Sequence, residues 1–255
     1  KIMKKNRSLS SFIKLPVYSL FFAFIAWSAY WFLGTIYIEN KVLKNNNIKY
    51  EKSTIAGYPI FFDINLKKLE YNLSKKISFE EVNFKTFAWR FDQIRTFINE
   101  QISIQISNSI TIKALPSNLI IDFYNYDDNS KKFEIIGNNI ILSENYSNKS
   151  FSIDGISGTI IQREIYNINI LTSKDSSSLK IQGYIDTKNE YLEGNLEFSF
   201  SEPKDIKRLF EIFSISIEEN PITNLLIYRG KINLIFEDGI SLLGPLPIGR
   251  APKLK

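Results

Sequence analysis

The sequence predicts a mainly β protein, with one N-terminal transmembrane helix followed by a twisted antiparallel β-sheet domain that carries one or two short helices. Three observations predict this class. One uncharged run lies near the start, from Leu15 to Ile38. Apolar and polar residues then alternate with a period of two along most of the chain, which is typical of strands with one apolar face. Short turn signals separate these runs, which favours antiparallel pairing.

The uncharged run from Leu15 to Ile38 is long enough to cross a membrane. Its 24 residues would reach about 36 Å as a helix, against a hydrocarbon core of about 30 Å. The positive-inside rule orients it, with a basic tail over residues 1–14 in the cytoplasm and residues 39–255 outside. The preceding basic residues are Lys1, Lys4, Lys5, Arg7 and Lys14.

A cleaved signal peptide is the competing interpretation of the same run. Its apolar region is usually about 7–15 residues long and ends at small residues. The triplet Ala26-Trp27-Ser28 loosely resembles such a site, but it lies inside the apolar run. We therefore interpret the segment as an uncleaved anchor, with Trp27, Tyr30, Trp31 and Tyr37 toward the outer headgroups.

Composition excludes several classes of function. The net charge of +5 comes from the five basic residues before the membrane segment, which leaves 27 basic and 27 acidic residues after it. That balance gives no reason to expect a nucleic-acid partner. The chain has no histidine and no cysteine, which excludes Ser-His-Asp and Cys-His catalysis, His-ligated zinc and disulfides. We expect no cofactor and no enzymatic activity.

Alternation predicts several strands after a helical spacer that continues from Glu39 to about Asn47. The clearest runs contain Phe62, Ile64 and Leu66; Ile102, Ile104 and Ile106; Ile168 and Ile170; and Ile232, Leu234 and Phe236. Three turn signals suggest successive hairpins. They lie at Gly137-Asn138-Asn139, at residues 186–189, and at Asp238-Gly239.

Two segments suggest short helices. In the first, Ser201 would cap the start, Pro203 would lie in the first turn, and Ile206, Leu209, Phe210 and Phe213 would share one face. The second candidate spans Phe87 to about Glu100, with Trp89 or Phe91, Ile94, Phe97 and Ile98 inward. Both are expected to lie across one end of the sheet.

The candidate chemical motifs are weak. Ser177 and Lys180 fit an S-x-x-K pattern, yet they fall in a turn that runs into a strand, so we expect them to be apart and exposed. Asp127-Asp128-Asn129 lacks the spacing of a calcium loop and is expected to be a hairpin tip. Glu80 and Glu81 should point to opposite faces of a strand. We expect no catalytic and no metal site.

Two glycine-proline motifs are expected to shape the chain. Gly57-Tyr58-Pro59 should form a bend between two strands close to the membrane. Near the C-terminus, Gly239 should lie in a hairpin turn, and residues 243–247 with Gly244 and Pro245 should begin an extended edge or strap. Both segments are interpreted as structural.

A family resemblance rests on these motifs. The basic N-terminus, the membrane helix ending in Tyr30-Trp31, the Gly57-Tyr58-Pro59-Ile60-Phe61-Phe62 segment and Leu242-Leu243-Gly244-Pro245-Leu246-Pro247 after Asp238-Gly239 resemble the alphaproteobacterial family catalogued as domain of unknown function 2125. The resemblance implies a membrane-anchored envelope protein without known activity. It also suggests kinship with AsmA-like proteins, whose twisted sheets are associated with phospholipid traffic.

The leading functional hypothesis is a single-pass inner-membrane protein with a periplasmic domain that binds or guides lipid acyl chains on an apolar sheet face. The predicted lining is Phe62, Ile64, Leu66, Ile102, Ile104 and Ile106. The expected partners are the bilayer and a phospholipid. The alternatives are a periplasmic scaffold that offers a sheet edge or its C-terminal tail to another envelope protein, and a Ser177/Lys180 hydrolase.

Overall fold

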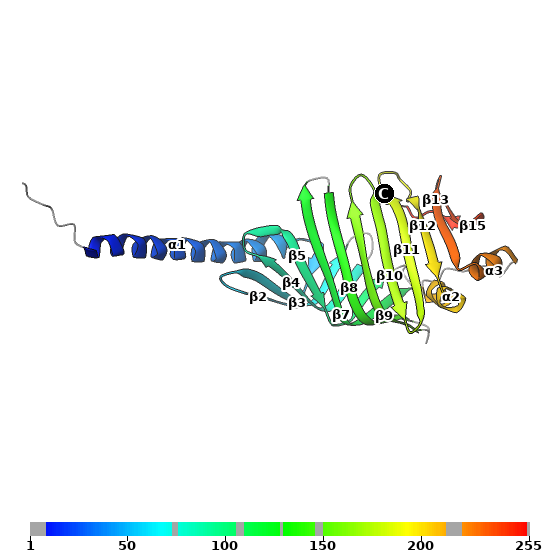
Figure 1. Ribbon diagram of the computed structural model, residues 1–255, viewed down its shortest axis with the longest axis horizontal. Coiled ribbons are helices and arrows are strands. Elements are labelled where there is room, and N and C mark those ends of the chain that lie inside the picture. Colours follow the sequence, from blue (N-terminus) through cyan, green and yellow to red (C-terminus); the bar gives the residue numbers. More distant parts are fainter. Residues whose placement is uncertain are drawn as a thin grey trace, which may run out of the picture.

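The computed structural model describes residues 9–72, 76–105, 110–127, 130–145, 150–212 and 221–253. One long helix leads into a single sheet, and two short helices lie at the far end of that sheet (Figure 1). The helical elements are α1 (Leu9–Tyr37), the π-helical turn η1 (Ile38–Val42), α2 (Pro203–Ile212) and α3 (Pro221–Tyr228).

The strands form one antiparallel sheet of 15 strands among the described residues. Its order is β1-β3-β4-β5-β7-β8-β9-β10-β11-β12-β13-β14-β15, with β2 added to β3 and β6 between β4 and β7. The strands are β1 (Ile48–Lys49), β2 (Lys52–Ala56), β3 (Phe61–Asn72), β4 (Lys76–Phe87), β5 (Arg90–Ile98), β6 (Ile102–Gln105), β7 (Thr111–Asp127), β8 (Ser130–Glu144), β9 (Ser150–Gln162), β10 (Tyr166–Lys174), β11 (Ser177–Asp186), β12 (Glu193–Phe200), β13 (Lys231–Glu237), β14 (Ile240–Leu243) and β15 (Leu246–Arg250).

The sheet is strongly twisted. Strands β2–β4 lie at a shallow angle beside α1, whereas β7–β12 stand steeply across the molecule (Figure 1). This progressive rotation is the usual right-handed strand twist accumulated over many neighbours. The predicted class, a mainly β protein with one N-terminal apolar helix, is confirmed.

A crease crosses the middle of the sheet, where inward-facing residues are spaced by three positions instead of two. Leu66 and Leu69 are both buried around Lys68, and Gly137 and Ile140 are both buried around Asn139. Lys68 and Asn139 each adopt a φ of 50°. The extra residue keeps the apolar side chains of both halves of these strands on the same side, so the core is continuous across the bend.

The hairpin predicted at residues 137–139 is wrong, because β8 runs through them and pairs on both sides of Asn139. Asn tolerates positive φ, so the same residues signal a turn or a kink within a strand. The other two predicted hairpins are confirmed, as β11–β12 and β13–β14. The predicted helical spacer after Glu39 is shorter than expected, since η1 ends at Val42.

The helix predicted from Phe87 to Glu100 is also wrong, because this segment forms the end of β4, a turn and β5. Ile94, Thr96 and Ile98 face inward and Arg95 and Phe97 outward, as their partners on β7 show. An apolar spacing of three or four over so few residues fits either structure, and the aromatic and β-branched content favours a strand.

Helix α2 confirms the first predicted helix over its described part, with Ile206, Leu209 and Phe210 buried. Phe213 lies outside the described residues. Ser201 does not cap α2: its hydroxyl accepts a hydrogen bond from the Ser178 amide, 2.8 Å away, and ties the chain to β11. Helix α3 was not predicted.

Candidate functional site

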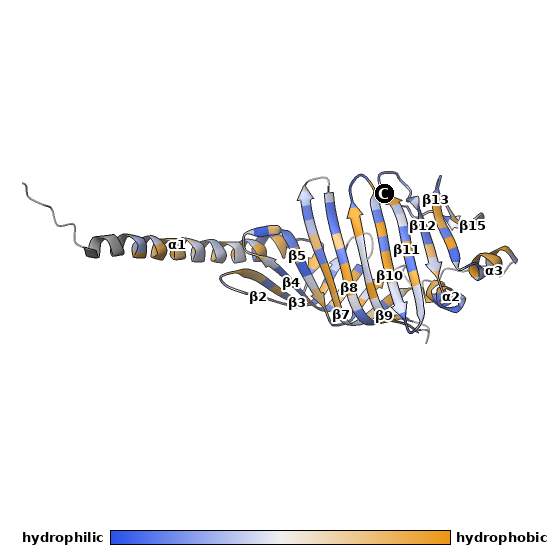
Figure 2. Cartoon of the chain, viewed as in Figure 1, coloured by the Kyte–Doolittle hydropathy of each residue, from blue (hydrophilic) through white to orange (hydrophobic). Residues whose placement is uncertain are grey.

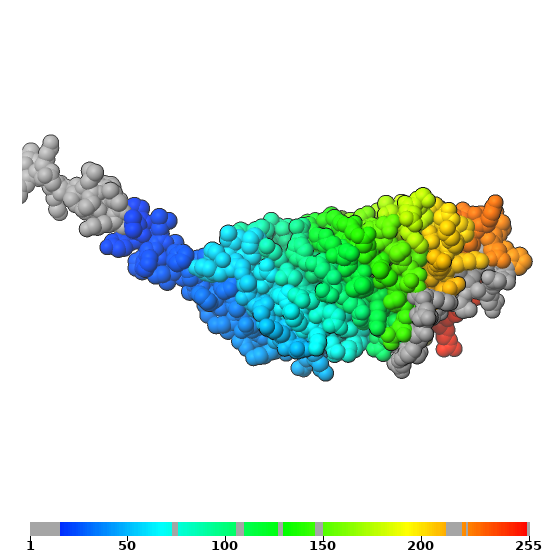
Figure 3. All heavy atoms as spheres, turned by 90° about the horizontal axis from the view of Figure 1, so that it is seen from below, coloured from blue at the N-terminus to red at the C-terminus, as the bar shows by residue number. Residues whose placement is uncertain are grey.

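The first strands are fastened to α1 by hydrogen bonds from its aromatic side chains. Trp27 Nε1 donates to the Pro59 carbonyl and Trp31 Nε1 to the Phe61 carbonyl, each at 2.9 Å. The Trp31 ring also stacks on Phe62, with centroids 5.4 Å apart and an interplanar angle of 11°. Figure 3 shows the first strands lying directly against the blue helix. The sheet therefore begins beside the segment that can span a membrane.

Three apolar rows cross the inner face of the sheet from β5 toward β13. Each row is a chain of directly paired residues, and none of the three contains a charge. Figure 2 shows apolar residues on all of these neighbouring strands. The outermost row is Ile94, Phe123, Phe133, Ile160, Ile168, Gly183, Leu196, Leu234 and Leu243; the middle row is Thr96, Ile121, Ile135, Gly158, Ile170, Ile181, Phe198 and Ile232; the row nearest the crease is Ile98, Leu119, Gly137, Ile156, Thr172, Leu179 and Phe200.

Burial decreases from the crease outward. In the row nearest the crease, Ile98 and Leu179 have exposed fractions of 2% and 5%. In the outermost row the members on β5, β7, β8, β9 and β10 are only half-buried and lie outside the main core cluster. With strands about 4.8 Å apart, this row extends roughly 38 Å from β5 to β14. The row is uncharged throughout, and its sheet leaves it partly open over β5–β10, about 19 Å, whereas Leu196, Leu234 and Leu243 pack in or against the core.

The opposite face of the same strands is mixed, with exposed Ile136, Leu171 and Tyr184 beside a polar central row. Its central row is Arg95, Asp122, Glu134, Thr159, Asn169, Gln182, Glu197 and Asn233. Residues adjacent along a strand point to opposite faces, so each polar residue of this row neighbours an inner-face residue. The three inner rows are uncharged, whereas the outer face combines a charged central row with exposed apolar side chains.

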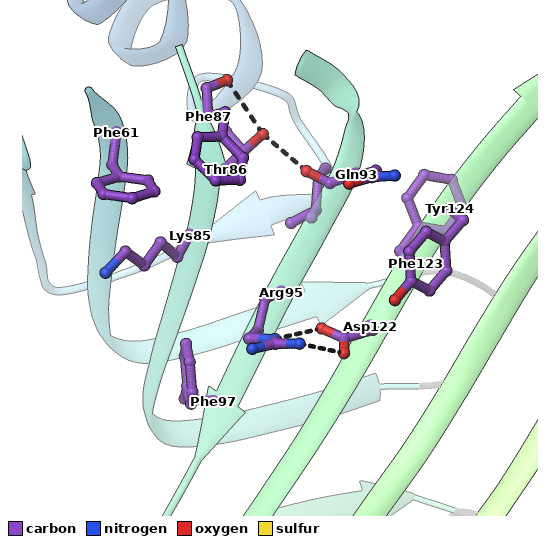
Figure 4. Close-up of a pocket in the computed structure, with 11 residues that line it drawn as sticks. Phe61, Lys85, Thr86, Phe87, Gln93, Arg95, Phe97, Asp122, Phe123 and Tyr124 are labelled. Atoms are coloured by element: carbon purple, nitrogen blue, oxygen red, sulfur yellow. Dashed lines mark hydrogen bonds and ion pairs between the residues drawn. The ribbon is translucent and has the colours of Figure 1, made fainter. Parts of the chain in front are cut away.

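A shallow depression of about 370 Å³ lies on this outer face near α1 (Figure 4). Arg95 donates two hydrogen bonds to the Asp122 carboxylate, at 2.6 and 2.8 Å, and this pairing raises the pKa of Arg95. Lys85 lies over the Phe61 ring, 4.4 Å from its centroid. Burial raises the pKa of Tyr124 at the far wall. Because the acid is already paired with the guanidinium, the depression offers no free carboxylate as a general base.

A second polar network holds β11, β12 and β13 together on this outer face. Glu197 accepts one hydrogen bond from Gln182 at 3.2 Å and pairs with Lys231 at 2.7 Å. The Lys231 hydrogen bond is the main cause of the lowered pKa of Glu197. These contacts stabilise the sheet.

The predicted lipid-contact residues all fall on the inner face where they are described. Phe62 and Leu66 have exposed fractions of 0% and 2%, and Ile102 has 8%. These three pack in the core and present little surface to a ligand. Ile64 is half-buried, Ile104 is 37% exposed, and Ile106 lies outside the described residues.

The outermost row was missed by reasoning from the sequence. Ile168 and Leu234 were recognised as members of alternating strands, but their place in one row depends on the register of nine strands. The signal available in the sequence is the matching apolar alternation of Ile168-Ile170 and of Phe133-Ile135. It indicates the face of each strand and not its alignment with the next strand.

The glycine-proline motifs lie in turns, as expected. Gly57, Tyr58 and Pro59 connect β2 to β3, with a φ of 93° at Gly57 and a cis peptide before Pro59. Gly239 turns β13 into β14 with a φ of 74°, and Gly244 and Pro245 connect β14 to β15. The segment after Pro245 forms the edge strand β15.

The S-x-x-K pair is separated in the structure. Ser177 donates to the Asp205 carboxylate at 2.7 Å, and Lys180 is exposed three residues further along β11, on the other face. Lys174 approaches the same carboxylate at 3.7 Å. Glu80 and Glu81 lie next to each other on β4, where Glu81 accepts a hydrogen bond from Asn65. Asp127 ends β7, while Asp128 and Asn129 lie outside the described residues.

Within the described part of the chain, no group of three or more Asp or Glu side chains is arranged to hold a metal ion. One helix, Pro16–Val42, is long and apolar enough to cross a membrane. Comparisons with family models, curated proteins and solved structures return no match. The family resemblance and its implications therefore stay predictions.

Proposed function

We propose that the protein is anchored in a bacterial inner membrane by α1 and holds lipid acyl chains against the outermost row on its periplasmic sheet. The half-buried, uncharged row that begins on β5, next to the strands fastened to α1, carries this proposal. The five basic residues before the uncharged run Leu15–Ile38 support the orientation with the sheet outside the cytoplasm.

The chemistry of the row supports lipid over a polar ligand. Half-buried side chains such as Phe133 and Ile168 gain free energy when an apolar chain covers them, at about 25 cal/mol per Å² removed from water. A polar substrate would find no hydrogen-bonding side chain along the row, whose members are all apolar or glycine. A continuous strip also fits an extended chain better than a compact small molecule.

The experiment compares two aspartate substitutions at neighbouring positions on β10. Ile168→Asp places a charge in the outermost row, and Asn167→Asp places the same charge on the opposite face. The full-length proteins are delipidated in detergent, incubated with phosphatidylglycerol and weighed by native mass spectrometry. Wild type and Asn167→Asp should retain the same number of lipids, and Ile168→Asp fewer. Equal retention by all three, with circular dichroism showing folded proteins, would contradict the proposal.

A scaffold is the second candidate, and the edge strand β15 favours it. Among the described residues β15 pairs only with β14, and it exposes Pro247 and Ile248. An extended segment of a partner could add to this edge by backbone hydrogen bonds. A photo-crosslinking residue at position 248 that captures one defined envelope protein, in cells where Ile168→Asp has no effect, would favour the scaffold over lipid binding.

A further inference from the structure

Two hairpin tips lie against the outward half of α1. The first tip, residues 57–60, joins β2 to β3, and the second tip, residues 88–89, joins β4 to β5. Besides the two tryptophan bonds, Tyr30 donates to the Ala88 carbonyl at 2.6 Å and Ser28 shares a hydrogen bond with the Tyr58 hydroxyl. The contacts fix both tips at the level of helix residues 27–31.

The length of the uncharged helix places that level inside the bilayer. A hydrocarbon core of about 30 Å needs roughly 20 helical residues. A span of about 20 residues placed anywhere within residues 15–38 ends between residues 34 and 38. Trp27 therefore lies about 10 Å or more inside the outer boundary of the hydrocarbon core. If both tips lay outside the hydrocarbon core, only residues 15–26 would remain to cross it. These residues form about 18 Å of helix, which is shorter than the core. Starting the span at Leu9 would place Lys14 about 8 Å inside.

The side chains of the tips suit that depth. Residues 53–62 and 86–89 contain no charge. Large apolar side chains are exposed around both tips, which would be unfavourable in water when they are gathered at one end of the domain. Aromatic side chains are also the ones that favour the boundary between headgroups and acyl chains. The exposed members are Tyr58 (41%), Ile60 (45%), Phe87 (38%), Trp89 (55%) and Phe91 (51%).

Most backbone carbonyl groups of the tips accept hydrogen bonds from within the protein. Polar backbone groups need an internal partner in hydrocarbon, since no water is available there. The Ile60 and Phe61 amides both bond to the Gly57 carbonyl, and the Ala88 amide bonds to the Ile60 carbonyl at 2.9 Å. Together with the bonds from α1, this provides a donor for the carbonyls of Gly57, Pro59, Ile60, Phe61 and Ala88.

We propose that both hairpin tips insert into the outer leaflet beside α1, among the acyl chains. The long side chains of Lys85 and Arg90, which flank the second tip, then extend toward the phosphate groups. This inference rests on α1 crossing the membrane, as proposed above, and not on lipid binding by the outermost row. Insertion would bring strand β5, where that row begins, close to the acyl chains themselves.

The test uses the natural absence of cysteine, which allows single labels in the full-length protein. Ile60→Cys and Trp89→Cys report on the tips, Val17→Cys on the helix, and Tyr228→Cys, 84% exposed on α3 at the far end, on the aqueous phase. Each variant carries an environment-sensitive fluorophore and is reconstituted in vesicles of phosphatidylethanolamine and phosphatidylglycerol. Quenching is measured with nitroxides on the lipid acyl chains and, separately, with iodide in water.

We expect the labels at positions 60, 89 and 17 to be quenched several-fold more by acyl-chain nitroxides than the label at position 228, and to be protected from iodide. If positions 60 and 89 behave like position 228 while position 17 is quenched by lipid, the insertion is overturned and the anchor stands. If the label at position 17 is also not quenched by lipid, the proposal that α1 crosses the membrane is contradicted, and the proposed insertion of the tips is contradicted with it. Should Trp89→Cys not fold, the label at position 60 decides the question alone.

Discussion

Replacing Phe62 by alanine should weaken the packing of the sheet against α1. The Phe62 side chain is fully buried and lies between the Trp31 ring, 5.4 Å away, and the Phe91 ring, 5.7 Å away. Removing a buried phenylalanine costs about 3–5 kcal/mol, against a total stability of about 5–15 kcal/mol for a domain. The variant should therefore remain folded while losing a large part of its free energy of unfolding.

Urea unfolding of the full-length protein in detergent micelles measures this effect, with circular dichroism following the strands and tryptophan emission following the junction with α1. All three tryptophans lie at that junction. Phe91→Ala serves as the matched control, because Phe91 packs on the same ring but is 51% exposed, and it should cost about 1 kcal/mol or less. A loss below about 1.5 kcal/mol for Phe62→Ala would refute the argument that this contact fastens the sheet to α1.

Three further predictions follow from close contacts and charges. Gly34→Ala should destabilise the junction by about 1–3 kcal/mol in the same urea assay, because the new Cβ would lie 2.5 Å from the Phe62 ring. This loss is expected although alanine has a helix propensity about 1 kcal/mol more favourable than glycine. Gly183→Ala should disrupt pairing of β11 with β12, seen as faster amide exchange there, because a Cβ would clash with the Asn195 carbonyl oxygen on β12 and the φ of this residue is 150°. The pKa of Glu197 is lower in the folded protein than its ordinary value of 4.5. The contribution of Glu197 to stability is therefore present above pH 4.5 and is lost as the pH falls through the pKa of the folded state. Wild type should thus lose up to about 1 kcal/mol more than Glu197→Gln on acidification, and identical pH profiles would contradict this assignment.

Local patterns were sufficient for the fold class and for most strands. The uncharged run of α1 and the alternation around Phe62 and Ile232 are properties of short windows, so they could be interpreted without knowing the partners of each strand. The Asp238-Gly239 turn is similarly local, because Gly supplies the positive φ that a tight hairpin needs.

The errors arose where one local pattern allows two structures. Asn139 could turn the chain back or kink a continuous strand, and the choice depends on whether β7 and β9 pair on both sides of it. Residues 87–100 could form a helix or a hairpin, and packing against β7 decides for the hairpin. The outermost row depends on the alignment of nine strands, so no single window of sequence contains it.

The most direct test of the account is photo-crosslinking from adjacent positions on β8 in cells. Phe133 lies in the outermost row and Glu134 in the polar row on the opposite face. A benzophenone side chain at position 133 of the full-length protein should form adducts with phospholipid that mass spectrometry identifies, and the same group at position 134 should not. Equal labelling at both positions, or no lipid adduct at position 133, would contradict lipid binding by the inner face.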